Sequence, residues 1–228
     1  MEMLKIKGLV LKKNDVGESD IRFTLFSEEI GKISAMVYGI KKSKKRSIGS
    51  YNPLCLTEFT LRKKNEFYSV IESDLIKNFE NITKDIEKLE ISLYILDSVN
   101  KIYDVNYEKN DFFYKLIEIF EFIEKIEKLE LGYKYYIVVL YLRKLMLEHG
   151  IYDTEELKDI MGINLMFKHN EISNVFKKQK NFFKIQKEFD NYVNILKKII
   201  LVFENYINEH LGVKLEIKKF IMEDLYNA

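Results

Sequence analysis

Residues 17–37 read GESDIRFTLFSEEIGKISAMV, and within them apolar and polar side chains alternate in two successive runs. In the first run, Ile21, Phe23 and Leu25 fall on one face of an extended chain, and the alternation resumes at Ile33. The short connection between the runs ends in a glycine, Gly31, which suits a turn. The pattern therefore predicts two half-buried β-strands joined by a short turn.

Three more strand-like stretches surround this pair, at residues 4–13, 54–61 and 67–71. Most connections are short, but the one at residues 39–53 is long. Five short strands within about 80 residues suit a small closed barrel, and the five-stranded oligonucleotide-binding (OB) barrel is the commonest such design. An SH3-like barrel gives much the same pattern. We therefore expect an OB-type β-barrel at residues 1–80.

The sequence changes character near residue 80. Five of the nine glycines and the only proline, Pro53, lie before that point, and apolar residues then recur at helical spacing. This spacing predicts helices at residues 82–103, 111–130, 131–148, 153–162, 188–211 and 215–226. The apolar stripe of the first runs through Ile82, Ile86, Leu89, Leu93 and Leu96 to Asn100. Residues 163–185 fit either a loop or a hairpin. We expect an α+β fold in which an α-helical bundle domain, centred on helix 131–148, occupies residues 81–228.

Charge and cysteine content exclude several classes of protein. The 228 residues carry 37 basic and 36 acidic side chains, so the chain is not a general polycation. Cys55 is the single cysteine, which excludes an intramolecular disulfide and a cysteine-rich metal cluster. The longest apolar run, 135–142, is too short to cross a bilayer, and the N-terminus lacks a signal-peptide pattern. We expect a cytoplasmic protein with no membrane partner.

The sequence contains no arrangement typical of catalysis or metal binding. It has neither a nucleophile-elbow motif nor a glycine-rich phosphate loop. The three histidines, His149, His169 and His210, lie far apart, so we expect no metal and no cofactor. Acidic residues at three-residue spacing from Glu118 to Glu130 fit a solvated helix face. We therefore expect a binding protein rather than an enzyme.

The most basic segment lies between two predicted strands, at residues 39–49. Five of the six positions 41–46 are basic, and residues 1–80 carry a net charge of +4 against −3 for residues 81–228. A cationic loop beside a barrel can neutralise phosphates and release their counterions. Several aromatic rings are candidates for stacking on bases, namely Phe26, Tyr38, Tyr51, Phe59 and Tyr68. The alternative is a solvated lysine-rich loop, with these rings in the barrel core.

Several short blocks of the sequence are informative together: residues 8–11, 17–20, 24–26, 31–34, 206–212 and 218–220, with Gly39, Pro53 and Leu215. These blocks resemble the RecO family of bacterial recombination mediators and come in the order of that family. The resemblance implies a barrel followed by helices over the whole chain. Many family members carry a four-cysteine zinc cluster in the region that corresponds to residues 150–185, but this chain has no cysteine there. We therefore carry over no metal.

The resemblance implies a non-enzymatic, nucleoid-associated protein that binds single- and double-stranded DNA and anneals complementary strands. With RecR it would help to load RecA onto DNA coated by single-strand-binding protein (SSB), whose acidic C-terminal tail would dock on the helical domain. The expected DNA contacts are basic residues of the barrel: Lys12, Lys13, Arg22, Lys32, Lys41, Lys42, Lys44, Lys45, Arg46, Arg62 and Lys63. The candidate contacts for the acidic tail are Lys197, Lys198, Lys218 and Lys219.

Two other functions stay open from the residues alone. An OB module that binds RNA or the ribosome would prefer structured RNA to single-stranded DNA. A helical interaction scaffold would bind nucleic acid weakly even at low salt.

Overall fold

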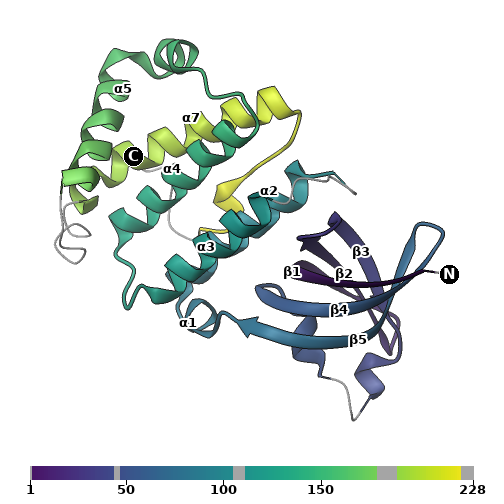
Figure 1. Cartoon of the computed structure of the whole chain (residues 1–228). Helices are drawn as coiled ribbons and strands as arrows, with labels where there is room; N and C mark the ends of the chain where they lie inside the picture. Colours follow the sequence, from purple (N-terminus) through teal and green to yellow (C-terminus); the bar gives the residue numbers. More distant parts are fainter. Residues whose placement is uncertain (1, 44–46, 105–110, 179–188, 222–228) are drawn as a thin grey trace. The chain divides into compact units, whose positions relative to one another are not determined.

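The computed structural model describes residues 2–43, 47–104, 111–178 and 189–221 (Figure 1). The chain forms two compact units. The first comprises Met1–Lys84 and Ile95–Lys125, and the second comprises Asp85–Tyr94 and Ile126–Ala228. Helix α2 (Ile86–Ile102) therefore contributes its first part to the second unit and its last part to the first. The boundary at residue 80 that the sequence suggests is a simpler division and stays a prediction.

Five strands form a closed barrel in the first unit. In chain order they are β1 (Glu2–Val16), β2 (Asp20–Ser27), β3 (Gly31–Val37), β4 (Cys55–Lys64) and β5 (Phe67–Asn78). Around the barrel the order is β1-β2-β3-β5-β4, and every pair is antiparallel except β3 with β5. This strand order, with one parallel pair (β3 with β5) and a long connection between β3 and β4, is typical of an OB barrel. The predicted α+β fold with an N-terminal OB-type barrel is confirmed.

Alternation along the strands fills this barrel with apolar side chains. Ile21, Phe23 and Leu25 of β2 point inward and are fully buried, as their spacing predicts. The Phe23 ring packs against Tyr51 and Phe59, with ring centroids 5.3 and 5.2 Å away. Burying a side chain of this size stabilises the fold by roughly 1.5–3 kcal/mol. Residues at the alternate positions of each strand lie on the outer surface of the barrel.

Helices cover part of that outer surface within the first unit. They are α3 (Asp111–Lys125) and the last part of α2, and the short helix α1 (Glu80–Thr83) packs against α3. Phe26 points outward from β2 but is fully buried, because the rings of Tyr103, Phe112 and Phe113 lie 5.1–6.3 Å from its own. This part of the barrel surface is therefore closed to a ligand.

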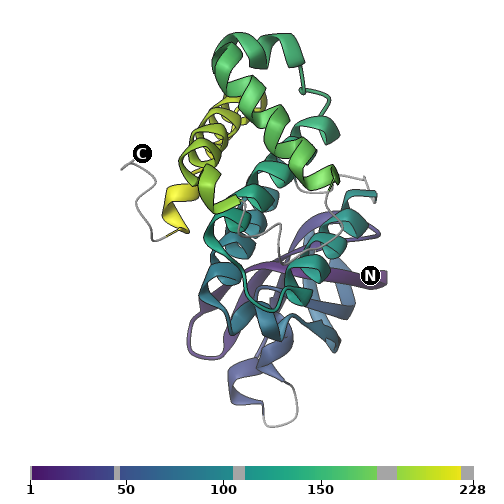
Figure 2. The same cartoon turned by 90° about the vertical axis from the view of Figure 1, so that its left-hand side faces the viewer.

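The second unit is helical, with α4 (Leu131–Glu148), α5 (Thr154–Lys178), α7 (Val193–Leu211) and the first part of α2. Helices α4 and α7 lie side by side, as Figure 1 and Figure 2 both show. Residues along most of α4 are buried, which agrees with the central place predicted for it. Lys134 of α4 is also fully buried, and it pairs there with Glu87 and Glu90 of α2. Among the described residues, no helix combines the length and apolar character needed to cross a membrane.

Two details of the helical predictions are wrong. Residues 163–178 are neither loop nor hairpin, because α5 continues through them after a break at Gly162, whose φ of 73° suits a glycine. The stripe predicted for residues 82–103 is displaced: Ile86 is 57% exposed, whereas Ile91 and Ile95 are fully buried. Because α2 contributes to two units, its burial does not follow a single stripe. The last part of the segment predicted as a loop or hairpin, from residue 179 onward, lies within residues 179–188, which are outside the described residues.

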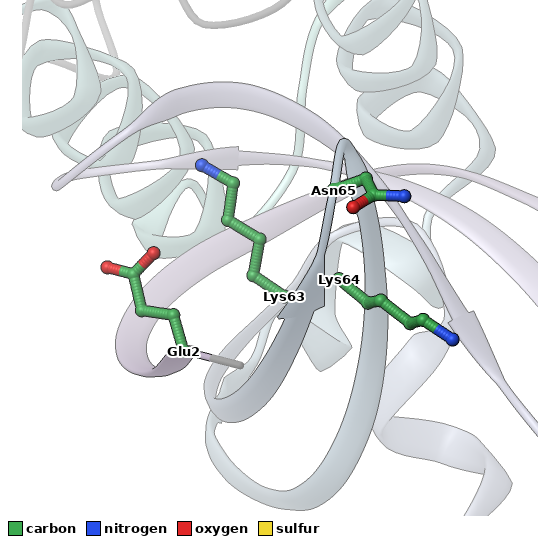
Figure 3. A pocket seen from close by; sticks show the side chains of 4 residues that line it. All are labelled: Glu2, Lys63, Lys64 and Asn65. Carbon is green, nitrogen blue, oxygen red and sulfur yellow. The ribbon is translucent and has the colours of Figure 1, made fainter.

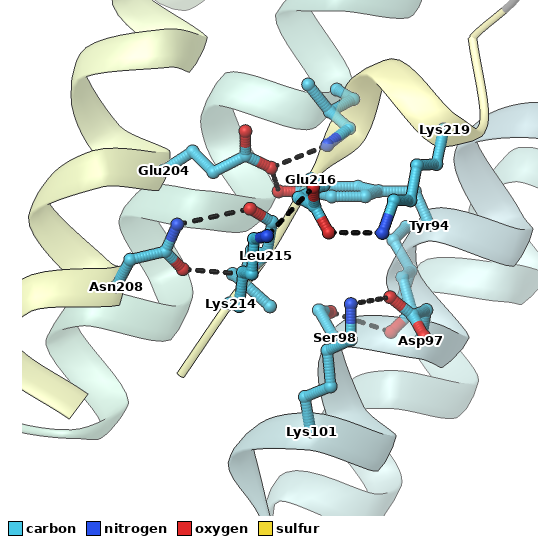
Figure 4. A network of polar contacts seen from close by, with 12 residues as sticks. Tyr94, Asp97, Ser98, Lys101, Glu204, Asn208, Lys214, Leu215, Glu216 and Lys219 are labelled. Atoms are coloured by element: carbon cyan, nitrogen blue, oxygen red, sulfur yellow. Dashed lines mark hydrogen bonds and ion pairs between the residues drawn. The ribbon is translucent and has the colours of Figure 1, made fainter. Parts of the chain in front are cut away.

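Over its described residues, the segment after α7 does not form the start of the helix predicted at residues 215–226. Within 215–221, Ile217–Lys219 form a single 3-10 turn, and the rest of the predicted helix, from residue 222, lies outside the described residues. Side chains of α7 hold this segment, in addition to its own short-range backbone hydrogen bonds (Figure 4). Asn208 bonds to both the backbone N–H and the carbonyl of Leu215, at 2.7 and 3.1 Å. Glu204 Oε1 accepts the Ile217 N–H at 2.7 Å and the Tyr94 hydroxyl at 2.9 Å.

Candidate nucleic-acid interface

One row of side chains crosses the outer surface of the barrel. The strand register places in this row Asn14 of β1, Arg22 of β2, Met36 of β3, Ser69 of β5 and Arg62 of β4. Arg22 and Arg62 are three strand spacings apart, or about 14 Å along the surface. Both are exposed, and neither has a carboxylate partner among the described residues. Two guanidinium groups at this separation can contact different phosphates of one strand.

The turn between β4 and β5 adds further cations at one end of the barrel. A shallow pocket of about 430 Å³ is lined there by Glu2, Lys63, Lys64 and Asn65 (Figure 3). Lys63 and Lys64 extend in different directions from the hairpin, as Figure 3 shows, because successive residues of a strand face opposite sides. The Lys63 Nζ lies 5.6 Å from the centre of the Tyr68 ring. Two lysines and one carboxylate give the lining of this pocket a net positive charge.

The start of the basic loop at residues 39–49 is held by acidic residues in and beside the β1–β2 turn. Asp20 accepts hydrogen bonds from the Gly39 N–H at 2.8 Å and from the Ser19 hydroxyl, and these bonds lower the pKa of Asp20. The amine of Lys41 pairs with Asp15 at 2.9 Å, and that of Lys42 with Glu18 at 3.7 Å. These pairs reduce the positive charge that the predicted loop offers to a phosphate. Its other cations, Lys44, Lys45 and Arg46, lie outside the described residues.

The other strand lysines differ in their surroundings. Lys12 is exposed on β1, and Lys13 donates to the side chain of Asn52 at 3.0 Å. Lys32 does not suit the DNA contact expected of it. Its amine donates at 2.6 Å to the backbone oxygen of Asn100, in the last turn of α2, and burial lowers its pKa. A lysine at this position satisfies a helix C-terminus rather than a phosphate.

Most of the aromatic rings proposed for base stacking belong to the core instead. Phe26, Tyr51 and Phe59 are fully buried, and Tyr68 is 8% exposed. They are buried because three of them point into the barrel and Phe26 lies beneath helix residues. Among these five, only Tyr38 is open to solvent, at 58% exposure. Sequence reasoning missed Phe67, which is 78% exposed at the β4–β5 turn. Its place directly after the polar turn 63–66 is the signal that could have pointed to it.

The cations proposed for an acidic tail are dispersed over the helical unit. Lys198 and Lys218 are exposed. Lys219 is exposed but pairs with Glu216. Lys197 is buried, with its amine 5.4 Å from the centre of the Tyr135 ring, so it cannot meet an external tail in this conformation. The structure therefore leaves Lys198, Lys218 and Lys219 as candidates.

Other polar residues of the sequence analysis have structural roles. Glu124 accepts the backbone N–H groups of Asn81 and Ile82 and so caps α1, and Glu121 pairs with Lys77 at 2.7 Å. Within the described ranges, no three His, Cys, Asp or Glu residues are placed to hold a metal ion. His169 packs edge-on against Phe203, and its burial, reinforced by the Arg143 charge, lowers its pKa to about 4.

Residues 1–79 match the family model described as "Recombination protein O N terminal". This N-terminal part of the chain is similar to the RecO family. The match covers all five strands of the barrel, including Arg22, Arg62 and Phe67.

Proteins described as "DNA repair protein RecO" are similar to this chain. The protein of Caldanaerobacter subterraneus subsp. tengcongensis is 28% identical over 126 residues, which are 55% of this chain and 51% of that protein. That of Thermoanaerobacter sp. is 33% identical over 106 residues (46% and 43%), and that of Acetivibrio thermocellus 36% over 102 (45% and 41%). These matches span only about half the length of each RecO relative.

Proposed function

We propose that this chain is a recombination mediator in DNA repair whose RecO-family barrel binds DNA. The observation that carries the proposal is the row containing Arg22 and Arg62, which lies on the part of the chain that matches the RecO family. Contacts of this kind reach phosphates rather than base edges, so we expect binding to both single- and double-stranded DNA without sequence preference. The mechanism requires no catalytic residue and no cofactor.

Annealing follows from the same chemistry. Two complementary strands repel each other through their phosphates, and a protein that neutralises part of this charge lets them approach. Cations on an exposed barrel surface can do this while the bases stay free to pair. Annealing by this route consumes no ATP.

We assign the contacts with other proteins to the helical unit. Lys198, Lys218 and Lys219 are exposed there and could accept the acidic C-terminal tail of SSB. Holding SSB on the same chain as the barrel would raise the local concentration of coated DNA at the annealing surface, and RecR would join this assembly before RecA is loaded. These steps extend the proposal beyond the barrel.

Annealing of two complementary labelled oligonucleotides, measured without ATP and with or without SSB, tests this function. We expect the full-length chain to accelerate annealing of bare strands at low salt, and to retain that activity on SSB-coated strands. Failure to accelerate annealing of bare strands at low salt would refute the proposed mediator function. Tighter binding to structured RNA than to single-stranded DNA would favour an RNA-binding module instead. Weak binding to every nucleic acid would favour an interaction scaffold.

A further inference from the structure

Phe67 is the most exposed of the large apolar side chains described. It is the first residue of β5, lies opposite Lys64 in the β4–β5 register, and has 78% of its surface open to solvent. The barrel gains almost nothing from a ring in that position, because apolar surface stabilises a fold only when it leaves water. Met3, opposite Arg62 on the neighbouring strand, is also 53% exposed. Two exposed apolar side chains therefore lie at this end of the barrel.

The cations around Phe67 lack the acidic partners that other lysines of the barrel strands have. Lys5 pairs with Glu58 across β1 and β4, and Lys77 at the far end of β5 pairs with Glu121. In contrast, no carboxylate among the described residues pairs with Arg62, Lys63 or Lys64. Two acidic residues lie near them: Glu2 is opposite Lys63 in the β1–β4 register, and Glu66 is in the β4–β5 turn. Three cations against two carboxylates leave a net positive charge.

The outward face of the hairpin brings these features together. Lys64 and Phe67 form one cross-strand pair, and Arg62 and Ser69 form the next pair along the same two strands. All four residues point out of the barrel, since they occupy the positions that alternate with the core residues Leu61, Tyr68 and Val70. Neighbouring side chains on one face of a hairpin are close enough to bind one ligand together.

We propose that Phe67 stacks on a base of single-stranded nucleic acid while Arg62 and Lys64 bind the flanking phosphates. The inference rests on the proposed function and adds a base-stacking site to it. A flat ring with cations on its own strand pair complements a nucleotide, which offers a π-face beside a negative charge. A single strand is required, because the bases of a duplex already stack on one another. This site extends the row of Arg22 and Arg62 toward the β4–β5 turn.

The absence of tryptophan from the sequence provides a direct test. A Phe67→Trp variant of the full-length chain carries one tryptophan at the proposed site, and stacking on a base quenches its fluorescence. The probes are an oligothymidylate and an abasic oligonucleotide of equal length, which has the phosphates without the bases. Leu147→Trp is the matched control, because Leu147 is 54% exposed on α4 in the helical unit. Binding of each oligonucleotide is followed independently by anisotropy of a label on the DNA.

We expect the oligothymidylate to quench Phe67→Trp strongly, the abasic strand to quench it little, and neither to quench Leu147→Trp. Phe67→Ala should weaken oligothymidylate binding about 5- to 150-fold, the range for loss of one stacked base, and should leave abasic binding unchanged. If the labelled oligothymidylate binds but Phe67→Trp is not quenched, or Phe67→Ala binds normally, the stacking site is refuted and the proposed function stands. If neither oligonucleotide binds the unmodified chain, the proposed function and the stacking site both fail.

Discussion

Replacing Arg22 and Arg62 with glutamine should flatten the salt dependence of binding to single-stranded DNA. Both guanidinium groups are exposed on the outer surface of the barrel and lie in one cross-strand row. Neither contributes to the apolar core, so the double variant should keep its fold. The change therefore removes the two proposed phosphate contacts and little else.

The size of the effect follows from counterion release. Each phosphate contact on a single strand contributes about 0.7 to the slope of log affinity against log salt, so the double variant should lose about 1.4 of that slope. We take the variant and the unmodified chain to bind equally at about 1 M salt, where counterion release no longer favours binding. The loss of slope then weakens binding by the variant about 25-fold at about 0.1 M salt and less than about threefold at about 0.5 M. Anisotropy of a labelled oligothymidylate across a salt series measures both quantities.

A matched control separates these contacts from net charge. Lys158→Gln with Lys168→Gln removes the same charge from α5, where the two lysines pair with Glu155 at 3.3 Å and Glu171 at 2.9 Å. This variant should keep the slope of the unmodified chain. An unchanged slope in the arginine variant, or an equal loss in the lysine control, would refute the proposed row of contacts.

Two further predictions concern the helical unit. Gly132→Ala should lower the free energy of unfolding by about 1–3 kcal/mol, because the new methyl group would overlap the backbone carbonyl of Phe189, which cannot move aside as a side chain can. Gly49→Ala is the control, because the methyl group there would meet only the Ser47 side chain, at an ordinary contact distance. Thermal melts that are the same for the two variants would contradict the prediction. His169 has its pKa lowered by burial to about 4, so the unfolded chain takes up a proton first as pH falls, and stability declines from about pH 6.5 down to about pH 4. Between pH 7 and pH 5 the free energy of unfolding should fall by about 2 kcal/mol, and His169→Phe should abolish this fall. Denaturant titrations at the two pH values measure it. An equal fall in the unmodified chain and in His169→Phe would show that other groups cause the decline.

The barrel could be predicted because its signal is local. Alternation at Ile21, Phe23 and Leu25 is enough to define a strand and its buried face, and the structure keeps that face. The same alternation places Phe26 on the outer face but cannot say that helix α3, more than eighty residues later, covers it. An outward ring is therefore a candidate for binding only once the distant part of the chain is known.

Individual lysines were harder to place than strands. Lys134 lies beside an apolar run and is fully buried, because two carboxylates of α2 meet it there. The Lys32 amine donates a hydrogen bond to a backbone oxygen of the same helix, that of Asn100. Both partners are far away in sequence, so no local pattern encodes them.

The candidate site was predictable as a set of residues but not as an arrangement. The sequence predicted both Arg22 and Arg62 as DNA contacts. Their common row depends on the parallel pairing of β3 with β5, which the alternation of single strands does not specify. Phe67 needed the structure as well, since a ring at a strand end is buried or open depending on its register.

Photo-cross-linking of the full-length chain to an oligonucleotide that contains 5-iodouracil tests the central claim most directly, because mass spectrometry of the cross-linked peptides locates the bound strand. We predict cross-links in the peptides that contain residues 20–38 and 62–69, on the outer surface of β2, β3 and the β4–β5 hairpin. Cross-links confined to residues 131–221 would place the nucleic acid on the helical unit and contradict a barrel interface.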